Sequence, residues 1–227
     1  MAPRVEPPAR RGGVQAGTAR RTAWRALIEL CGALVTLDRS WYRLRKLIAR
    51  TYFRTKLQGC GRNCRFDPLS SEIFYEAVTL GDNAFIGPGA VIGRAVIGND
   101  VMFGPNVHVR NGNHSFEVIG VTIQDASDPS DDRDPVVIED DVWIGQDTTI
   151  LPRGRVGEGS VIGTRSIVNR PVPPYVIAAG APCRIIRKRF SDEELRRHLV
   201  LRGRTPAEIG AMVARRADAL RELGQDH

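Results

Sequence analysis

The chain has 227 residues, of which 33 are Lys or Arg and 26 are Asp or Glu, so its formal net charge is +7. The charge is uneven, because residues 1–65 contain 15 basic and 3 acidic residues whereas the remaining 162 contain 18 and 23. An apolar content of 42% excludes a fully disordered chain, and the absence of an 18-residue apolar run excludes a simple membrane-spanning helix. An aromatic content of 6% disfavours a base-stacking platform, so we expect no nucleic-acid partner.

The N-terminal quarter is predicted to be a disordered arm followed by a basic helical extension. Residues 1–21 are rich in Pro, Gly and Arg, a composition typical of disorder. Residues 22–65 form the extension, in which 22–57 alternate apolar and basic side chains with helical spacing. A basic amphipathic helix suits an anionic membrane surface, so 22–57 either contact such a surface or pack on the rest of the chain. We predict a cytoplasmic location, peripheral at the inner face of the membrane if that contact forms.

A six-residue repeat marks the central part of the chain, for which we predict one domain over residues 66–187. Branched aliphatic residues recur without a break at Ile138, Ile144, Ile150, Val156, Ile162 and Val168. An α-helix has a period of 3.6 and an ordinary strand a period of 2, so neither explains this spacing. Short parallel strands that turn at Gly, Asn or Asp and stack rung on rung do explain it. We therefore predict an all-β parallel solenoid.

An upstream block of the same form runs from LGDNAF (80–85) to FGPNVH (103–108). The repeat stops at His114, and a non-repeating segment of 21 residues, 115–135, separates this block from the next rung. Long irregular loops inside compact domains are usually functional. This loop contains six acidic residues and one arginine. We expect either a lid over a neutral acceptor or a solvated acidic loop.

The last segment, residues 188–227, is predicted to form two helices. Ser191 with Glu194 and Thr205 with Glu208 have the spacing of capping boxes, which mark helix starts. We expect these helices to dock on the end of the solenoid or on a neighbouring subunit.

Four strings resemble the hexapeptide-repeat acyltransferases, most closely the maltose/galactoside and exopolysaccharide O-acetyltransferases. They are FGPNVHVRNGNH (103–114), VVIEDDVWIGQDTTILP (136–152), GSVIGTRSIV (159–168) and PPYVIAAGAPCRIIR (173–187). The resemblance implies a left-handed parallel β-helix, here with N-terminal and C-terminal helical extensions. It also implies a homotrimer that transfers an acetyl group from acetyl-CoA to a hydroxyl of a sugar, glycan or small acceptor, as in polysaccharide biosynthesis.

His114 is the candidate general base. Of the other histidines, His108 occupies a repeat position expected of a rung or interface side chain, and His198 and His227 lie in a charged helical segment and at the C terminus. The resemblance places the family's base at the root of the long loop. Histidine side chains titrate near pH 6.5, so a neutral imidazole can accept a hydroxyl proton at neutral pH. No nucleophile elbow is present and no cysteine adjoins His114, which favours direct attack in a ternary complex over an acyl-enzyme.

The resemblance also assigns residues to acetyl-CoA. The predicted set is Trp143, Gln146, Thr164, Asn169, Arg170, Arg184 and Arg187. Trp143 corresponds to a tryptophan near the pantetheine, and the arginines correspond to basic residues that meet coenzyme phosphates, for which a guanidinium fork is suited. The family usually has Thr-Lys where this chain has Asn169-Arg170. Outward packing of the tryptophan and solvated arginines are the alternative interpretations.

Three other activities remain open at this point. A sugar N-acyltransferase would use the same base and thioester with an amine acceptor. A gamma-type carbonic anhydrase needs three histidines on zinc, and only His108 and His114 lie in the repeat. A non-enzymatic β-helix protein is the third. The four cysteines are too few and too scattered for a disulfide framework or a zinc site, so we expect reduced thiols and no metal.

Overall fold

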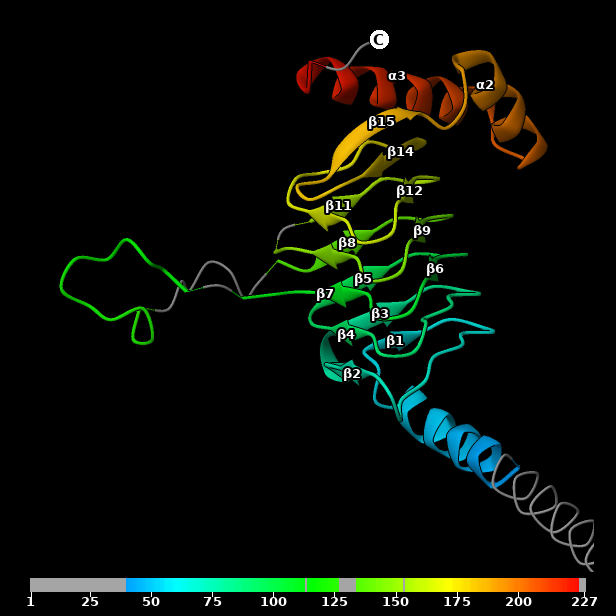
Figure 1. The fold of residues 1–227 in the computed structure, drawn as a ribbon. Helices are drawn as coiled ribbons and strands as arrows, with labels where there is room; N and C mark the ends of the chain where they lie inside the picture. The colour runs from blue at the N-terminus through cyan, green and yellow to red at the C-terminus, as the bar shows by residue number, and fades with distance from the viewer. Residues whose placement is uncertain (1–39, 113, 127–133, 153, 225–227) are drawn as a thin grey trace, which may run out of the picture. The chain divides into compact units, whose positions relative to one another are not determined.

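The computed structural model describes residues 40–112, 114–126, 134–152 and 154–224. The chain divides into two compact units, residues 1–47 and residues 48–227. In the first, residues 40–47 are helical; in the second, helical residues 48–54 precede a β-solenoid (Figure 1). The predicted arm 1–21, and the extension before residue 40, lie outside the described residues. No helix in the described part of the chain combines the length and apolarity needed to cross a bilayer.

The solenoid is built from short strands. Their bounds are β1 (Gly59–Cys60), β2 (Glu72–Ile73), β3 (Val78–Leu80), β4 (Val91–Ile92), β5 (Ala95–Ile97), β6 (Met102–Phe103), β7 (His108–Val109), β8 (Val136–Ile138), β9 (Trp143–Ile144), β10 (Thr149–Ile150), β11 (Arg155–Val156), β12 (Val161–Ile162), β13 (Ile167–Val168), β14 (Val176–Ala179) and β15 (Arg184–Lys188), with a short 3₁₀ helix at Tyr75–Ala77. They form three five-stranded sheets. Sheet A has the order β1-β3-β5-β8-β11, sheet B β15-β14-β12-β9-β6, and sheet C β13-β10-β7-β4-β2. All pairs are parallel except β14 with β15.

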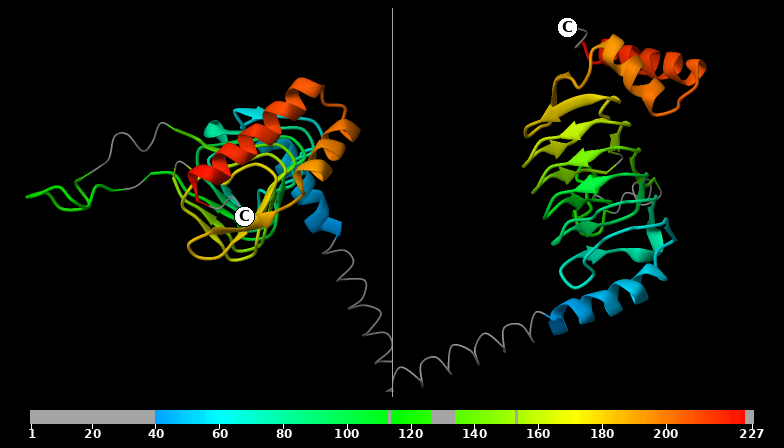
Figure 2. Two further views of the ribbon diagram at one scale, coloured as in Figure 1. Left: turned by 90° about the horizontal axis from the view of Figure 1, so that it is seen from above. Right: turned by 90° about the vertical axis from the view of Figure 1, so that its right-hand side faces the viewer.

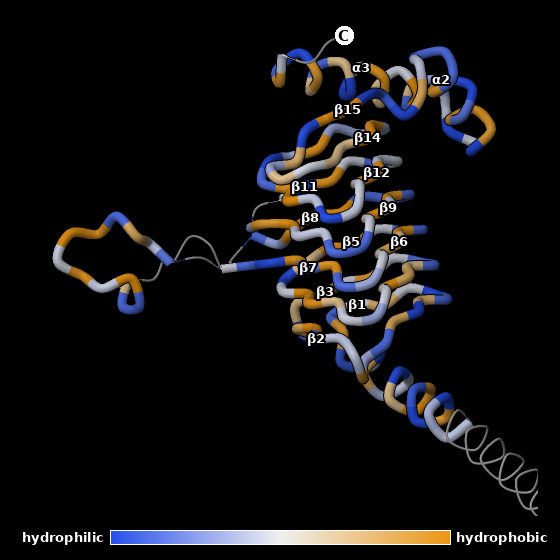
Figure 3. Tube along the Cα trace, in the orientation of Figure 1, coloured by the Kyte–Doolittle hydropathy of each residue, from blue (hydrophilic) through white to orange (hydrophobic). Residues whose placement is uncertain are grey.

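The six-residue repeat places one aliphatic side chain per strand inside the solenoid. The six residues from Ile138 to Val168 that define it are at most 1% exposed. The small residues between them, such as Thr148 and Ser160, are 0% exposed and fill the corners. Hydrophobic segments accordingly recur along the strands of each turn in Figure 3. The predicted all-β solenoid is therefore confirmed, because the repeat buries a continuous core that no single rung could form.

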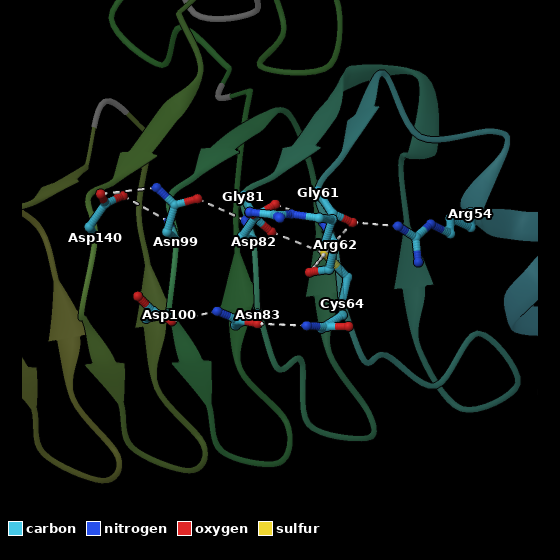
Figure 4. Close-up of polar contacts among 11 residues, drawn as sticks. Arg54, Gly61, Arg62, Cys64, Gly81, Asp82, Asn83, Asn99, Asp100 and Asp140 are labelled. Atoms are coloured by element: carbon cyan, nitrogen blue, oxygen red, sulfur yellow. Dashed lines mark hydrogen bonds and ion pairs between the residues drawn. The ribbon is translucent and has the colours of Figure 1, made fainter.

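The corners between sheets A and B turn on Asn and Asp. Asn83, Asp100 and Asp141 all have φ near +60°, a left-handed conformation that Asn and Asp tolerate better than most residues. Their side chains also connect successive rungs: the Asn83 amide donates to Asp100 at 2.8 Å, and the Asn99 backbone N–H donates to Asp140 at 2.7 Å (Figure 4). These residues set both the bend and the stacking of the rungs.

The solenoid begins earlier than the sequence indicated. β1 at Gly59–Cys60 already pairs in parallel with β3, whereas the β-helix was predicted to start at residue 66. The inward side chains of this first rung are Leu57, Cys64 and Phe66, all buried. Because this rung lacks branched aliphatic residues at six-residue intervals, the repeat pattern did not predict it.

Two helices cover the other end. After the β14–β15 hairpin come α2 (Asp192–Leu201) and α3 (Pro206–Glu222), each opened by the predicted capping box. They lie across the end of the solenoid (Figure 2). Leu195 and Leu199 of α2 pack with Tyr175 of the last rung, and Leu220 of α3 belongs to the solenoid core. The helices thus dock on the solenoid of their own chain.

Candidate active site

Each turn of the solenoid has three corners, which stack into three edges named here by the sheets they join. The long loop leaves from the C–A edge, between β7 and β8, and projects away from the solenoid (Figures 1 and 2). The turns after β9 and β12 lie on the B–C edge, and the segment after β13 lies on the C–A edge. The sequence-predicted site residues therefore fall on these two edges and, for Trp143, Arg184 and Arg187, on the strands of sheet B.

His114 lies at the root of the loop, and its side chain is exposed. The loop is closed at its base by a hydrogen bond from the Ser115 N–H to the Ala126 carbonyl at 2.9 Å. Near the same root, both amide atoms of Asn111 are buried and have no partner among the described residues. A buried amide without partners is costly, so this is a position where a bound polar group would be stabilised.

The loop exposes apolar side chains, which its acidic composition did not lead us to expect. Phe116 is 68% exposed and Ile119 is 100% exposed. Three of the loop's six acidic residues and its arginine fall within 127–133, outside the described residues. Within the part that the structure describes, the loop presents an apolar surface that its own subunit does not cover.

Trp143, Gln146 and Thr164 come together on neighbouring rungs. Trp143 opens β9, is 50% exposed, and is paired with Met102 of β6 and Val161 of β12 on the outer face of sheet B. Gln146 and Thr164 are exposed in the following turns on the B–C edge. Those turns stack closely, since the Arg165 N–H donates to the Gln146 carbonyl at 2.8 Å.

Arg170 and Arg184 line one cavity of about 230 Å³ at the C-terminal end. Both guanidinium groups are on exposed side chains; that of Arg184 donates to the Cys183 carbonyl at 3.0 Å. Burial raises the pKa of the Cys183 thiol in the cavity wall, so this cysteine is a poor nucleophile. The cavity joins exposed cations to an apolar wall, which fits a phosphate-bearing coenzyme with an organic arm.

Asn169 and Arg187 do not line the cavity that Arg170 and Arg184 share. Asn169 is exposed on the C–A edge directly before Arg170. Arg187 is paired with Ile177 in the β14–β15 hairpin, donates to the Lys188 carbonyl at 3.0 Å, and does not line the cavity. Leu223, after α3, does line it. The sequence did not indicate Leu223 as a cavity residue, because its position depends on how α3 docks. Cys183 also lines the cavity, and it lies within the APCRIIR string that the sequence had singled out.

His108 and His198 pack within the fold, and His227 lies outside the described residues. His108 sits in β7, paired with Val91 and Thr149 in sheet C. His198 packs on Tyr175 and Phe190, and burial, with nearby Arg189, lowers its pKa. Among the described residues, no group of three or more His, Cys, Asp or Glu side chains could hold a metal ion.

Comparison with known proteins places this geometry in a family. No family model matches the chain. A protein of Saccharomyces cerevisiae assigned as an acetyltransferase is 33% identical over 138 residues, covering 60% of this chain and 68% of the relative. A solved hexapeptide-repeat acetyltransferase of Vibrio cholerae, in complex with acetyl-CoA, has a TM-score of 0.55 and 29% identity over 61% of this chain and 75% of that one. The chain belongs to the hexapeptide-repeat acetyltransferases. The predicted family and its left-handed β-helix are confirmed. The acetyl-CoA bound to the Vibrio cholerae neighbour agrees with the predicted co-substrate.

Other relatives match over shorter stretches. A chloramphenicol acetyltransferase of Morganella morganii is 52% identical over 58 residues, which cover 26% of this chain and 28% of the relative. A galactoside O-acetyltransferase of Lactococcus lactis is 34% identical over 100 residues, which cover 44% of this chain and 45% of the relative. The chain thus spans less than half the length of these two proteins.

Proposed function

We propose that this acetyltransferase transfers the acetyl group of acetyl-CoA to a hydroxyl of a neutral sugar, glycan or small acceptor. The observation that carries the proposal is that the loop bearing His114 leaves the C–A edge, on which the cavity arginine Arg170 also lies. Val109, Ile150 and Val168 pair in register, so the segments after them stack. At about 4.8 Å per rung, Arg170 follows the loop root at roughly 10 Å along the axis. The loop that carries His114 therefore leaves the solenoid from the same edge as a candidate phosphate-binding group.

In this proposal His114 acts as general base. Its exposed imidazole accepts the proton of the acceptor hydroxyl through a ring nitrogen as the oxygen attacks the acyl carbon. The C–S bond of the thioester then breaks, and the imidazolium returns that proton to the departing coenzyme sulfur, which leaves as the thiol. Acetyl-CoA, when bound, supplies the activated acetyl group as a thioester. Backbone N–H groups of a turn are the donors available for the developing oxyanion. Direct transfer is supported by the lack of a reactive cysteine at the cavity, since Cys183 is held as the neutral thiol.

The coenzyme would be held by two sets of residues. Arg170 and Arg184 suit its phosphates, and Trp143 suits contact with its pantetheine arm. Trp143, with Gln146 and Thr164, lies on the sheet B face and the B–C edge, not on the edge that carries His114. This separation supports a site formed between copies of the chain, as in the predicted homotrimer. The uncovered apolar side chains of Phe116 and Ile119 on the loop support the same arrangement.

The assignment of His114 is tested by its replacement in the purified full chain. His114→Ala should lower kcat for labelled acetyl transfer by about 10²–10⁴-fold, the usual contribution of a general base. His108→Ala, six residues earlier in β7, is the matched control and should keep wild-type turnover. Near-wild-type turnover of His114→Ala would refute the assignment. An acceptor panel of sugars, glycans and amino sugars decides the acceptor class, and transfer to amines alone would favour the N-acyltransferase alternative.

The coenzyme assignment has a separate test that needs no acceptor. Arg170→Ala and Arg184→Ala should each weaken acetyl-CoA binding, measured by calorimetry, by roughly tenfold or more. A charge-assisted hydrogen bond contributes about 1.5–3 kcal/mol, and about 1.4 kcal/mol corresponds to tenfold. Unchanged affinity in both variants would show that the cavity does not hold the coenzyme.

A further inference from the structure

A polar cavity lies at the opposite end of the solenoid from the coenzyme arginines. Its volume is about 550 Å³, within the range of about 300–1,000 Å³ typical of small-molecule sites. It is lined mainly by Arg50, Arg54, Arg65, Asn63, Cys64 and Asn83. These residues come from the helical segment 48–54 and from the first two A–B corners, away from the loop that carries His114. The cavity is therefore separate from the proposed active site.

The three arginines leave most of their hydrogen-bond donors available. Arg50 is half-buried, and its guanidinium makes no hydrogen bond or ion pair with the described residues. Arg54 donates one N–H to the Gly61 carbonyl (Figure 4). The Arg65 guanidinium lies 5.2 Å from the centre of the Phe85 ring, and a stacked guanidinium keeps its in-plane N–H groups free for another partner.

The positive charge of this cavity has no matching carboxylate in its wall. Residues 48–66 contain five Lys or Arg and no Asp or Glu. Two acids of the neighbouring corners have other partners: Asp82 accepts a hydrogen bond from Arg62 at 2.6 Å, and Asp100 accepts one from Asn83 at 2.8 Å (Figure 4). The buried Asp67, which follows Arg65 by two residues, does not line the cavity. Burial, followed by a hydrogen bond with Cys60, raises the pKa of the Cys64 thiol to about 11, so it adds no negative charge at neutral pH.

Like charges gathered in one hollow repel each other unless an anion compensates them. The amides of Asn63 and Asn83 add polar contacts, because the Asn63 amide donates to Asn83 at 3.2 Å and so fixes both side chains in the wall. The planar guanidinium groups of the three arginines can each donate two parallel hydrogen bonds to the oxygens of a phosphate.

We propose that this cavity binds a phosphate or diphosphate group through Arg50, Arg54 and Arg65. The group could belong to a soluble phosphorylated ligand or to the headgroup of an anionic lipid, and the chemistry of recognition is the same. The lipid source would account for the membrane contact predicted for residues 22–57. The proposal does not depend on the acceptor or on the role of His114.

Pyrophosphate titration of the full chain, followed by calorimetry, tests the site. Arg50→Gln/Arg65→Gln should weaken pyrophosphate binding at this site by at least tenfold, since two charge-assisted contacts are removed. Arg196→Gln/Arg197→Gln, on exposed positions of α2, removes the same charge and is the matched control. Arg170→Gln/Arg184→Gln identifies any second binding event at the coenzyme cavity. Arg50→Lys/Arg65→Lys keeps the charge without the fork and should give an intermediate affinity.

Co-sedimentation with vesicles identifies the source of the phosphate. If the ligand is a lipid headgroup, the chain pellets with phosphatidylcholine vesicles containing phosphatidylglycerol, not with phosphatidylcholine alone, and pyrophosphate releases it. If pyrophosphate binds and neither vesicle pellets the chain, the ligand is a soluble phosphate compound. The proposal is overturned if Arg50→Gln/Arg65→Gln binds pyrophosphate as tightly as the Arg196→Gln/Arg197→Gln control.

Discussion

Replacement of Gly145 by alanine tests whether the spacing of the rungs is as tight as the structure indicates. A Cβ built on Gly145 would lie 2.5 Å from the Thr164 nitrogen and 2.9 Å from the Ile162 oxygen. Both are backbone atoms of the next rung, which cannot rotate away. Since Cβ contacts below 3.0 Å essentially never occur, the two turns must separate by about half an ångström.

That separation strains two hydrogen bonds that hold the turns together. The Gly145 N–H donates to the Ile162 carbonyl at 2.8 Å, and the Arg165 N–H donates to the Gln146 carbonyl at 2.8 Å. Overpacking costs about 1–3 kcal/mol, and each weakened hydrogen bond adds up to about 1 kcal/mol. We expect Gly145→Ala to lower the free energy of unfolding by about 2–4 kcal/mol. For a chain of this size that is roughly 5–15 °C in the midpoint of thermal unfolding.

Gly210→Ala is the matched control because it makes the same chemical change in an open place. Gly210 lies within α3, and nothing stands within 4 Å of its built Cβ. Alanine is the better helix former by about 0.5–1 kcal/mol, so this variant should be more stable than wild type. Urea unfolding followed by circular dichroism, at one protein concentration for all variants, measures both effects.

The contrast between the two variants decides the question. If Gly145→Ala unfolds at the wild-type urea midpoint, the rungs have more room than these distances allow and the reasoning is refuted. Equal losses in both variants would likewise show that rung spacing is not the cause. Gly145 lies between Trp143 and Gln146, so a displaced turn should also raise the KM for acetyl-CoA. That rise would link the packing of the turn to the proposed coenzyme groove.

Three further predictions concern the C-terminal end and the buried thiol. Tyr175→Phe removes the hydroxyl that donates to Glu158 at 2.9 Å and should lower the free energy of unfolding, measured in urea, by about 1–2 kcal/mol; no change would mean that water replaces the bond. Asp192→Ala leaves the 1% exposed Arg216 without its carboxylate and should cost about 1–3 kcal/mol by thermal unfolding, less than the about 3–5 kcal/mol of a fully buried pair because Asp192 is 56% exposed. The Cys64 thiol, whose pKa rises from 9.0 to about 11 by burial, favours the folded state below pH 9, and this contribution is lost as the pH rises through about 11; urea midpoints between pH 8 and 11 should therefore fall more steeply in wild type than in Cys64→Ala.

Much of the fold could be predicted because the hexapeptide repeat is a local signal. The position of a residue within each repeat predicts whether its side chain points inward. Ile144 and Val156 are accordingly both buried, although they lie on different strands of the solenoid. The capping boxes at Ser191 and Thr205 are also local, since their hydrogen bonds join residues three apart. The first rung escaped prediction because Leu57, Cys64 and Phe66 fill it without an aliphatic period.

The sequence by itself determined the solenoid, the loop at His114 and the chemical types of the candidate coenzyme residues. Only the tertiary structure decided which of these share an edge: Arg170 lies on the edge from which the His114 loop leaves, whereas Trp143, Gln146 and Thr164 lie elsewhere on the subunit. It also gathered Arg50, Arg54 and Arg65 around one cavity and left Arg187 outside the other. The physical reason is that the repeat fixes the inward direction of each side chain locally, while neighbours around a corner or across rungs are set by how the turns close and stack.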